Sequence, residues 1–405
     1  MLITNKTYNQ EANELADKIT LMTKERYSKW LISHKYIVDQ SDVDGVLSRQ
    51  SEFCDTVIIK EAERVTENQR LLLECESARV EEKQKALIDR QKVFQSVVDE
   101  VTRYTEELMI NRLSELNVLR LFGKFPDFSY FLEMAYSPSL TYSKLSTLIT
   151  NDNQLKNNVV ELVNNPKFCS RIGKSVRGIA DPKVALGVLG IDNCKVLFPI
   201  LMAKPLLRWH EKVTKAIAPK LWQHMILTAN VTKLRLQDAE LKNSEQGIAL
   251  GVLRTISYFA IVNQFPQLFE DALIEKMQDF RNKDQREQYY ACAEIKPTLK
   301  VLPNVIIKLE ENLTRKVVES IEWTPFNIHL KNALLEDLDH VPVKERSDHG
   351  KALAQALAYS VYDSMDRSNA FVEKHKPFWF ASVLMPPESL KKLRAVGAGK
   401  IELVK

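Results

Sequence analysis

Along most of this chain the hydrophobic residues follow the spacing of amphipathic helices, and hardly any segment alternates as a β-strand does. The longest helical stretch, residues 46–122, contains neither Gly nor Pro and consists mostly of good helix formers. Shorter helical patterns follow it, separated by Gly, Pro, Asn and Asp. The pattern predicts an all-α protein that combines long helices with a compact group of shorter ones.

Within the long stretch, apolar residues recur at every seventh position, as in one seam of a coiled coil. These residues are Ile59, Leu73, Val80, Leu87, Phe94, Val101 and Leu108, with Thr66 in the one gap. The positions three residues further on are mostly polar, so a strict two-stranded seam is not predicted. Two alternatives stay open: an arm that packs on its own domain, or an arm that binds a second copy or another protein.

The sequence changes in character around residues 123–126, where we expect a domain boundary. Short helices are then expected to begin at Thr141, Asp181 and Asp192, because these side chains can cap a first turn. The predicted organisation has three parts: a helical arm over 1–122, a compact multi-helix domain over 123–338 and a helical extension over 339–405.

Composition and charge narrow the class of protein. The chain is 45% hydrophobic and 27% charged, which is ordinary for a globular protein. Its net charge of +4 comes from mixed acids and bases, so no nucleic-acid partner is expected. Five scattered cysteines without a CxxC pair favour reduced thiols. No signal peptide and no membrane span is recognised, so we expect a cytoplasmic protein without a membrane partner.

Common catalytic motifs do not occur in the sequence. There is no dinucleotide-binding glycine motif, no P-loop and no GxSxG nucleophile elbow. The local group of acids and histidines comprises Asp337, Asp339, His340, Asp348 and His349. It lies in a loop-like segment where acids commonly cap helices and form turns, so a metal site there is not favoured. No cofactor is predicted.

Three passages together resemble the HDOD family, the HD-related output domains of bacterial signalling proteins. They are FPDFSYFLEMAYSPSLTYSKLSTLITNDNQLKNNVVELVNNPKF, IGKSVRGIADPKVALGVLGIDNCKVLFP, and LWQHMILTANVTKLRL with the following IALGVLRTISYFAIV. The resemblance covers about residues 120–335. It implies a helical output or adaptor module whose partners are other signalling proteins.

In HD-type hydrolases, to which this family is related, histidines and aspartates bind the catalytic metal. Here His224 stands where the first histidine would be, and Arg254-Thr255 stands where the His-Asp pair would be. Arginine has no lone pair to donate and stays protonated, so it cannot replace a metal-binding imidazole. The resemblance therefore implies a vestigial site at His224, Arg254 and Thr255, with no metal and no catalytic residue.

The sequence neighbours of His224 and Arg254 predict how each side chain is buried and paired. His224 falls on the apolar stripe of its helix, which favours a buried core histidine. Arg254 lies in a helix that is apolar nearly all round, so its charge must reach solvent or pair with an acid. We hypothesise that it fills part of the vestigial site and pairs with a carboxylate.

The predicted function is non-catalytic: signal transduction or scaffolding through protein–protein contacts, with a homodimer through the arm as one possibility. Two alternatives remain. One is a metal-dependent phosphohydrolase, which would need at least three converging metal ligands. The other is a sensor in which Arg254 holds a nucleotide or another anionic ligand in the vestigial cavity.

Overall fold

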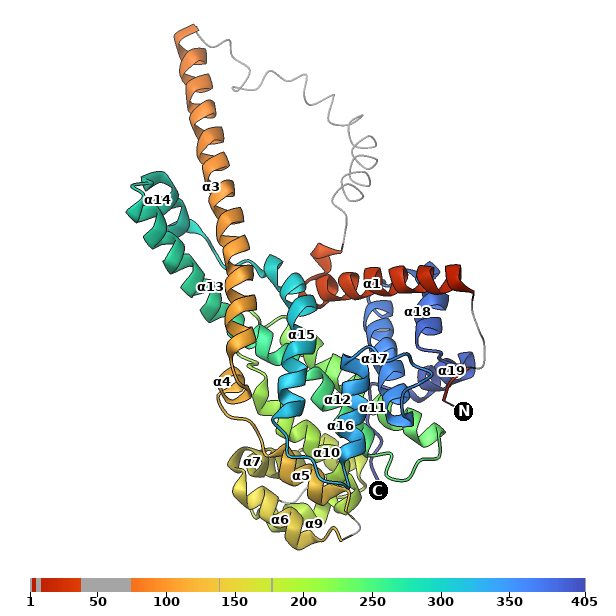
Figure 1. Ribbon diagram of the computed structural model, residues 1–405. Helices are drawn as coiled ribbons and strands as arrows, with labels where there is room; N and C mark the ends of the chain where they lie inside the picture. Colours follow the sequence, from red (N-terminus) through yellow and green to blue (C-terminus); the bar gives the residue numbers. More distant parts are fainter. Residues whose placement is uncertain (1, 5–8, 38–73, 138, 176–177, 405) are drawn as a thin grey trace, which may run out of the picture.

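The computed structural model describes residues 2–4, 9–37, 74–137, 139–175 and 178–404. The predicted all-α class is confirmed, since the described residues contain helices and no strand (Figure 1). The first helices are α1 (Gln10–Ile32), α3 (Glu74–Glu115) and α4 (Val118–Phe122). A group of short helices follows: α5 (Phe128–Ala135), α6 (Tyr142–Asn151), α7 (Asn153–Val163), α8 (Pro166–Arg171), α9 (Pro182–Leu189) and α10 (Ile191–Ala203).

The remaining helices build the centre of the molecule and its C-terminal side. The central ones are α11 (Ala218–Asp238), α12 (Gln246–Thr255), α13 (Ser257–Asn282), α14 (Arg286–Glu294) and α15 (Leu302–Glu319). The last ones are α16 (Ile328–Leu338), α17 (Asp348–Asp366), α18 (Lys376–Ser382) and α19 (Pro387–Val396). One large apolar cluster runs through nearly all of these helices, so the short helices and the C-terminal helices share a core.

Two of the three predicted helix starts are confirmed by side-chain caps. Thr141 accepts a hydrogen bond from the backbone N–H of Lys144, and Asp181 accepts one from that of Lys183. The expectation for Asp192 is wrong. Helix α10 begins directly after Gly190, whose positive φ of 77° suits glycine, and Asp192 already lies in the first turn.

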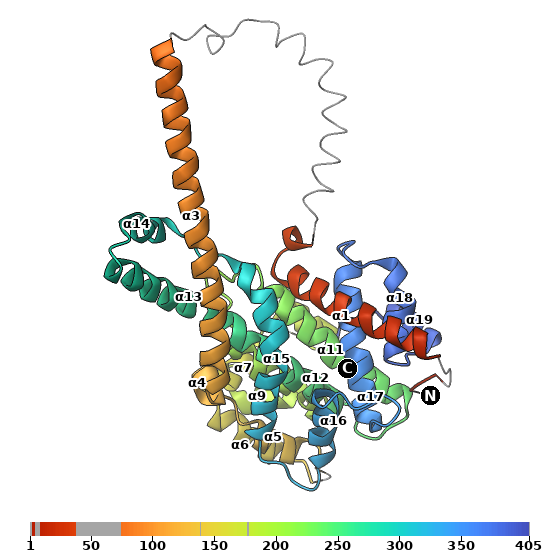
Figure 2. The ribbon, with the colours of Figure 1, turned by 45° about the horizontal axis from the view of Figure 1, so that its top comes forward.

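Helix α3 projects from the body by its first half and packs against it by its second half (Figures 1 and 2). Leu87, in the projecting half, is 66% exposed, whereas Val101 is fully buried where α3 meets α13 and α15. The second half therefore packs on its own domain, as one of the two alternatives proposed. The heptad positions Ile59, Thr66 and Leu73 lie outside the described residues.

Helix α1 packs on the C-terminal side of the molecule, separately from α3. It lies across α15 and α18 and also contacts α17 (Figure 2). Its inner face buries Ile19, Tyr27, Trp30 and Leu31. In the described part of the predicted arm over 1–122, α1 and α3 thus cover different parts of the molecule.

Helices α11 and α12 approach each other unusually closely. A Cβ added at Gly251 would lie 2.4 Å from the Ala229 Cα, and one added at Gly247 would lie 2.5 Å from the Lys233 backbone N. These distances are too short for any side chain, so the two backbones are in direct contact there. The contact fixes the position of Arg254, one turn after Gly251.

Helices α12 and α13 follow each other directly over Gln246–Asn282, and this segment contains a long apolar window. By length and composition this stretch could cross a membrane, with a mean hydropathy of 1.3 in its best window. The sequence had suggested that no such span exists. In the structure 89% of that window is buried inside the protein, as is typical of a core helix.

Candidate functional site

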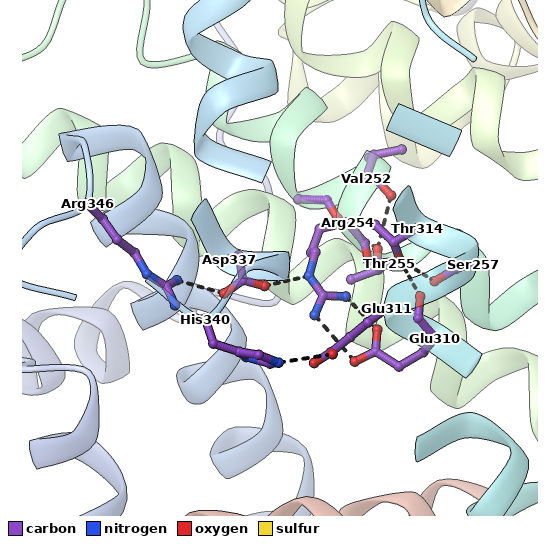
Figure 3. Close-up of polar contacts among 11 residues, drawn as sticks. Val252, Arg254, Thr255, Ser257, Glu310, Glu311, Thr314, Asp337, His340 and Arg346 are labelled. Atoms are coloured by element: carbon purple, nitrogen blue, oxygen red, sulfur yellow. Dashed lines mark hydrogen bonds and ion pairs between the residues drawn. The ribbon is translucent and has the colours of Figure 1, made fainter. Parts of the chain in front are cut away.

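Arg254 lies in the last turn of α12 and is only 5% exposed. Its Nε donates to the Asp337 Oδ2 at 2.6 Å, and its two terminal nitrogens donate to the Glu310 carboxylate at 2.6 and 3.3 Å (Figure 3). Burial alone would lower the pKa of Arg254, but the charges of Glu310 and Asp337 raise it instead. The hypothesis that Arg254 pairs with an acid is confirmed.

A second arginine completes this group of charges. Arg346 donates to the Asp337 Oδ1 at 2.7 Å and to the Val341 carbonyl oxygen at 2.7 Å. Burial raises the pKa of Asp337, but the two arginines outweigh that effect and hold this pKa at about 2. We call Arg254, Glu310, Asp337 and Arg346 the Arg254 network. It joins α12, α15, α16 and the loop before α17 by ion pairs that are almost entirely buried.

The Thr255 side chain makes no contact with the Arg254 network and instead bonds within its own helix. Its hydroxyl donates to the Gly251 carbonyl oxygen at 2.7 Å, within its own helix, and the residue is 1% exposed. The Arg254 carbonyl oxygen lies 3.5 Å from the Thr314 hydroxyl of α15. Thr255 therefore supports the end of α12, and its side chain is not among those that line the cavity described below.

His224 is a buried histidine of α11, only 2% exposed, with one ring nitrogen bonded and the other not. Its Nδ1 lies 2.8 Å from the Ser360 hydroxyl, which also donates to the His224 carbonyl oxygen. We therefore assign the proton to Nδ1, which leaves Nε2 as an acceptor. Among the described residues, Nε2 has no hydrogen-bond partner. Burial, and to a lesser extent Arg254, lowers the pKa of His224 to about 3.

His224 and the Arg254 network line a cavity of about 530 Å³. The Arg254 network and His224 contribute to its polar lining, and α15, α17 and α18 contribute apolar side chains such as Ile306, Leu357 and Trp379. Helix α1 contributes a further wall, including Tyr27. A volume of this size is typical of small-molecule sites.

The structure brings together only part of what the sequence singled out. His224 and Arg254 line one cavity, and Asp337 and His340 of the acidic loop group line it too. The other members of that group lie in separate contacts: Asp339 pairs with Arg315, Asp348 with Lys351, and the His349 Nε2 lies 3.3 Å from the Gln246 Oε1. In the part of the chain that the structure describes, no three His, Cys, Asp or Glu side chains could share a metal ion.

Sequence reasoning missed Glu310 and the whole contribution of α1. Glu310 sits 56 residues from Arg254, and Asp337 sits 83 residues away. Glu310 has no local motif that would single it out, and Asp337 was noticed only as a member of the local group of acids and histidines, not as a partner of Arg254. The one available signal was the need of a buried arginine for a carboxylate, which predicts that a partner exists but does not say where.

The residues at this site do not fit a divalent metal ion. The two buried carboxylates already accept charged hydrogen bonds from arginines, and a guanidinium lies where a cation would have to sit. A metal would have to displace Arg254 against charge repulsion and leave it unpaired.

The chain contains an HDOD domain, because residues 126–293 match the sequence model of that domain. The resemblance identified from the sequence is thereby confirmed. Arg254 and His224 fall inside the match, whereas Glu310, Asp337 and Arg346 lie beyond it. The partners of Arg254 are thus supplied by the part of the chain that follows the matched region.

A solved structure adds a distant similarity. It is that of a candidate metal-dependent phosphohydrolase from Shewanella amazonensis SB2B, with 10% sequence identity and a TM-score of 0.38. The match covers 70% of this chain and 98% of the other. No curated protein matches the chain.

Proposed function

We propose that this chain is a non-catalytic signal-transduction or scaffold protein that acts through protein–protein contacts of its HDOD domain. The observation that supports this most directly is the Arg254 guanidinium, held by two buried carboxylates in the place where an HD-type enzyme would carry metal ligands. Because an ion-pair network occupies this place, we infer that the protein works through contacts at its surface.

The chemistry of hydrolysis explains why this arrangement favours a non-catalytic role. A metal phosphohydrolase needs an ion that lowers the pKa of bound water and holds a phosphate oxygen. Here Glu310 and Asp337 are neutralised by arginines, and the His224 Nδ1 is bonded to the Ser360 hydroxyl and not to a carboxylate that could orient the ring as a base. The phosphohydrolase alternative therefore lacks a set of groups that could activate water.

The alternative of an anion sensor is also weakened by the charges around the cavity. Its lining includes five carboxylates and three basic side chains, which gives a formal charge of −2 with the histidines neutral. The guanidinium of Arg254 already donates to both of its carboxylate partners. A nucleotide phosphate would have to compete with them in a negative environment.

Affinity capture from the protein's native cells tests the proposed role, followed by reconstitution from purified components. We expect a defined partner that binds stoichiometrically and remains bound in EDTA, because no metal is needed to hold the fold of the site. If purified chain and partner associate only in the presence of a divalent cation, or if no partner is found and the chain cleaves phosphodiesters, the proposal is wrong.

A further inference from the structure

Residues 398–404, which follow α19, lie against the HDOD domain and are bound there by their backbone. The Asn193 side chain of α10 donates to the Val404 carbonyl oxygen and accepts from the Val404 N–H, both at 2.8 Å. The Asn230 side chain of α11 donates to the carbonyl oxygens of Ala398 and Lys400 at 2.8 and 3.1 Å. Two side-chain amides thus bind both ends of this segment.

Two cationic side chains bind the middle of the segment. Arg171 of α8 donates to the Ile401 carbonyl oxygen at 2.6 Å, and the Lys233 ammonium of α11 donates to the Glu402 carbonyl oxygen at 3.4 Å. We call Arg171, Asn193, Asn230 and Lys233 the docking site, and all four lie within the matched HDOD domain. Because these side chains bind backbone atoms, another sequence that follows the same path can form the same hydrogen bonds.

The docking site consists largely of polar side chains that are buried. Asn193, Asn230 and Lys233 are only 5%, 1% and 7% exposed. In the part of the chain that the structure describes, the Asn230 amide nitrogen donates only to residues 398–404. A buried donor without a partner is costly, so these side chains are suited to a site where a polypeptide backbone lies across them.

The side chains of the segment alternate between the protein and the solvent. Ile401 and Leu403 are half-buried and pack against the large apolar cluster, whereas Glu402 and Val404 are exposed. This alternation is typical of an extended chain. A peptide bound in the same way therefore needs two apolar side chains, two positions apart.

The charges of the docking site favour an acid between these two apolar side chains. Within the described residues, neither Arg171 nor Lys233 forms an ion pair with a carboxylate. Burial lowers the pKa of Lys233, and the carboxylates of Glu245 and Glu402 oppose this effect. An acidic side chain at the position of Glu402 therefore complements the two cations.

A glycine-containing turn connects the segment to α19. Gly397 has a positive φ of 70°, which favours glycine, and directly follows the last residue of the helix. At Gly399 the nearest atom to an added Cβ would be 3.8 Å away, in the Arg367 side chain, so the backbone there is not tightly enclosed. The segment can therefore leave the docking site while α19 stays in place.

We propose that the docking site binds an extended segment of a partner protein, with an acidic residue between two apolar ones, and that residues 398–404 cover the site until the partner displaces them. Main-chain hydrogen bonds combined with contacts to alternate side chains are a common mode of peptide recognition. The inference rests on the proposed function, because it names the surface through which the protein–protein contacts are made.

Fluorescence anisotropy of a labelled peptide with the full chain tests this inference. The peptide AGKIELV repeats residues 398–404 and is blocked at both ends. The variant Ile401→Lys/Leu403→Lys loses both apolar contacts and places positive charges near the two cations, so its docking site should be open. We expect the peptide to bind this variant with a Kd of about 50 µM. In the wild-type chain the attached segment competes at about 1 mM effective concentration, so binding should be about twentyfold weaker.

The control for this variant lies just outside the segment. Val396 is the last residue of α19 and is 47% exposed. Val396→Lys should therefore leave the segment in place, and this variant should bind the peptide as weakly as the wild-type chain does.

Changes in the peptide test the individual contacts without altering the protein. N-methylation at the position of Val404 removes the donor to Asn193 and should weaken binding to the open variant about tenfold. Lysine at the position of Glu402 should weaken binding as well. The inference is overturned if the open variant does not bind the peptide, if the wild-type chain binds it equally tightly, or if either modified peptide binds as well as the parent. Partner capture does not depend on which surface the partner uses, so it tests the proposed function separately.

Discussion

Replacing Arg254 by methionine should destabilise the protein strongly. The change keeps much of the apolar stem but removes the charge, and it leaves Glu310 and Asp337 with side chains only 12% and 11% exposed. Removing one partner of a buried ion pair costs about 3–5 kcal/mol, because the remaining charge is left uncompensated. Asp337 keeps Arg346, so the loss should come mainly from Glu310.

An exposed ion pair between α15 and α16, the two helices that supply the partners of Arg254, offers a control. Arg315 of α15 pairs with Asp339 at the end of α16, at 2.5 Å, but these side chains are 36% and 53% exposed. Exposed pairs contribute about 0–1 kcal/mol, so Arg315→Met should have a small effect. Urea unfolding followed by far-UV circular dichroism measures both free energies. A cost for Arg254→Met within about 1 kcal/mol of that for Arg315→Met would refute the structural role of the network.

The double variant Arg254→Met/Glu310→Gln examines the cause of the loss. Because it removes the unpaired charge together with its partner, it should recover part of the stability lost in Arg254→Met. The pH dependence of the unfolding free energy also reports on the charge pairing of Asp337. Since the pKa of Asp337 is lowered to about 2, its contribution to stability is present above about pH 4 and is lost as the pH falls towards 2. In Arg254→Met the pKa of Asp337 should be lowered less, so this acid loss should be smaller and should end at a higher pH.

Three further predictions concern packing, charge and the projecting helix. Gly251→Ala should cost about 3 kcal/mol or more in urea unfolding, because its Cβ would meet the Ala229 backbone, whereas Gly187→Ala, with open space around it in α9, should be neutral or slightly stabilising. The pKa of about 3 at His224 means that stability falls as the pH drops from about 6.5 to 3, and thermal unfolding across this range should show a shallower fall for His224→Phe. Leu87→Asp should change the unfolding free energy by less than about 0.5 kcal/mol, since this side chain is 66% exposed. A drop in mass for Leu87→Asp by light scattering would instead reveal a second copy bound to α3.

The sequence predicted the fold class because helical periodicity is a local property. The absence of Gly and Pro over residues 46–122 and the side-chain caps at Thr141 and Asp181 are read from neighbouring residues. In the described part, residues 74–122, and after both caps, helices form where expected. Asp192 shows the limit of such reasoning. Asp192 can serve as a cap by type, yet the positive φ of Gly190 decided where the helix begins.

The site was predicted only as far as local physics reaches. An arginine in a helix that is apolar all round needs a carboxylate, and this was foreseen for Arg254. Which carboxylates pair with Arg254 depends on how α15 and α16 pack against α12. This packing is set by contacts between residues far apart in the sequence. The same holds for α1, whose wall of the cavity comes from residues some 200 positions before His224.

The central claim is that the Arg254 network stands in place of a catalytic metal centre. The most direct measurement is the metal content of the purified chain after loading with Mn²⁺, Fe²⁺ or Zn²⁺, together with its hydrolysis of bis(p-nitrophenyl) phosphate. We predict far less than one equivalent of bound metal and no hydrolysis above a protein-free control. One or two equivalents of metal, with phosphodiester cleavage that a chelator abolishes, would contradict the account.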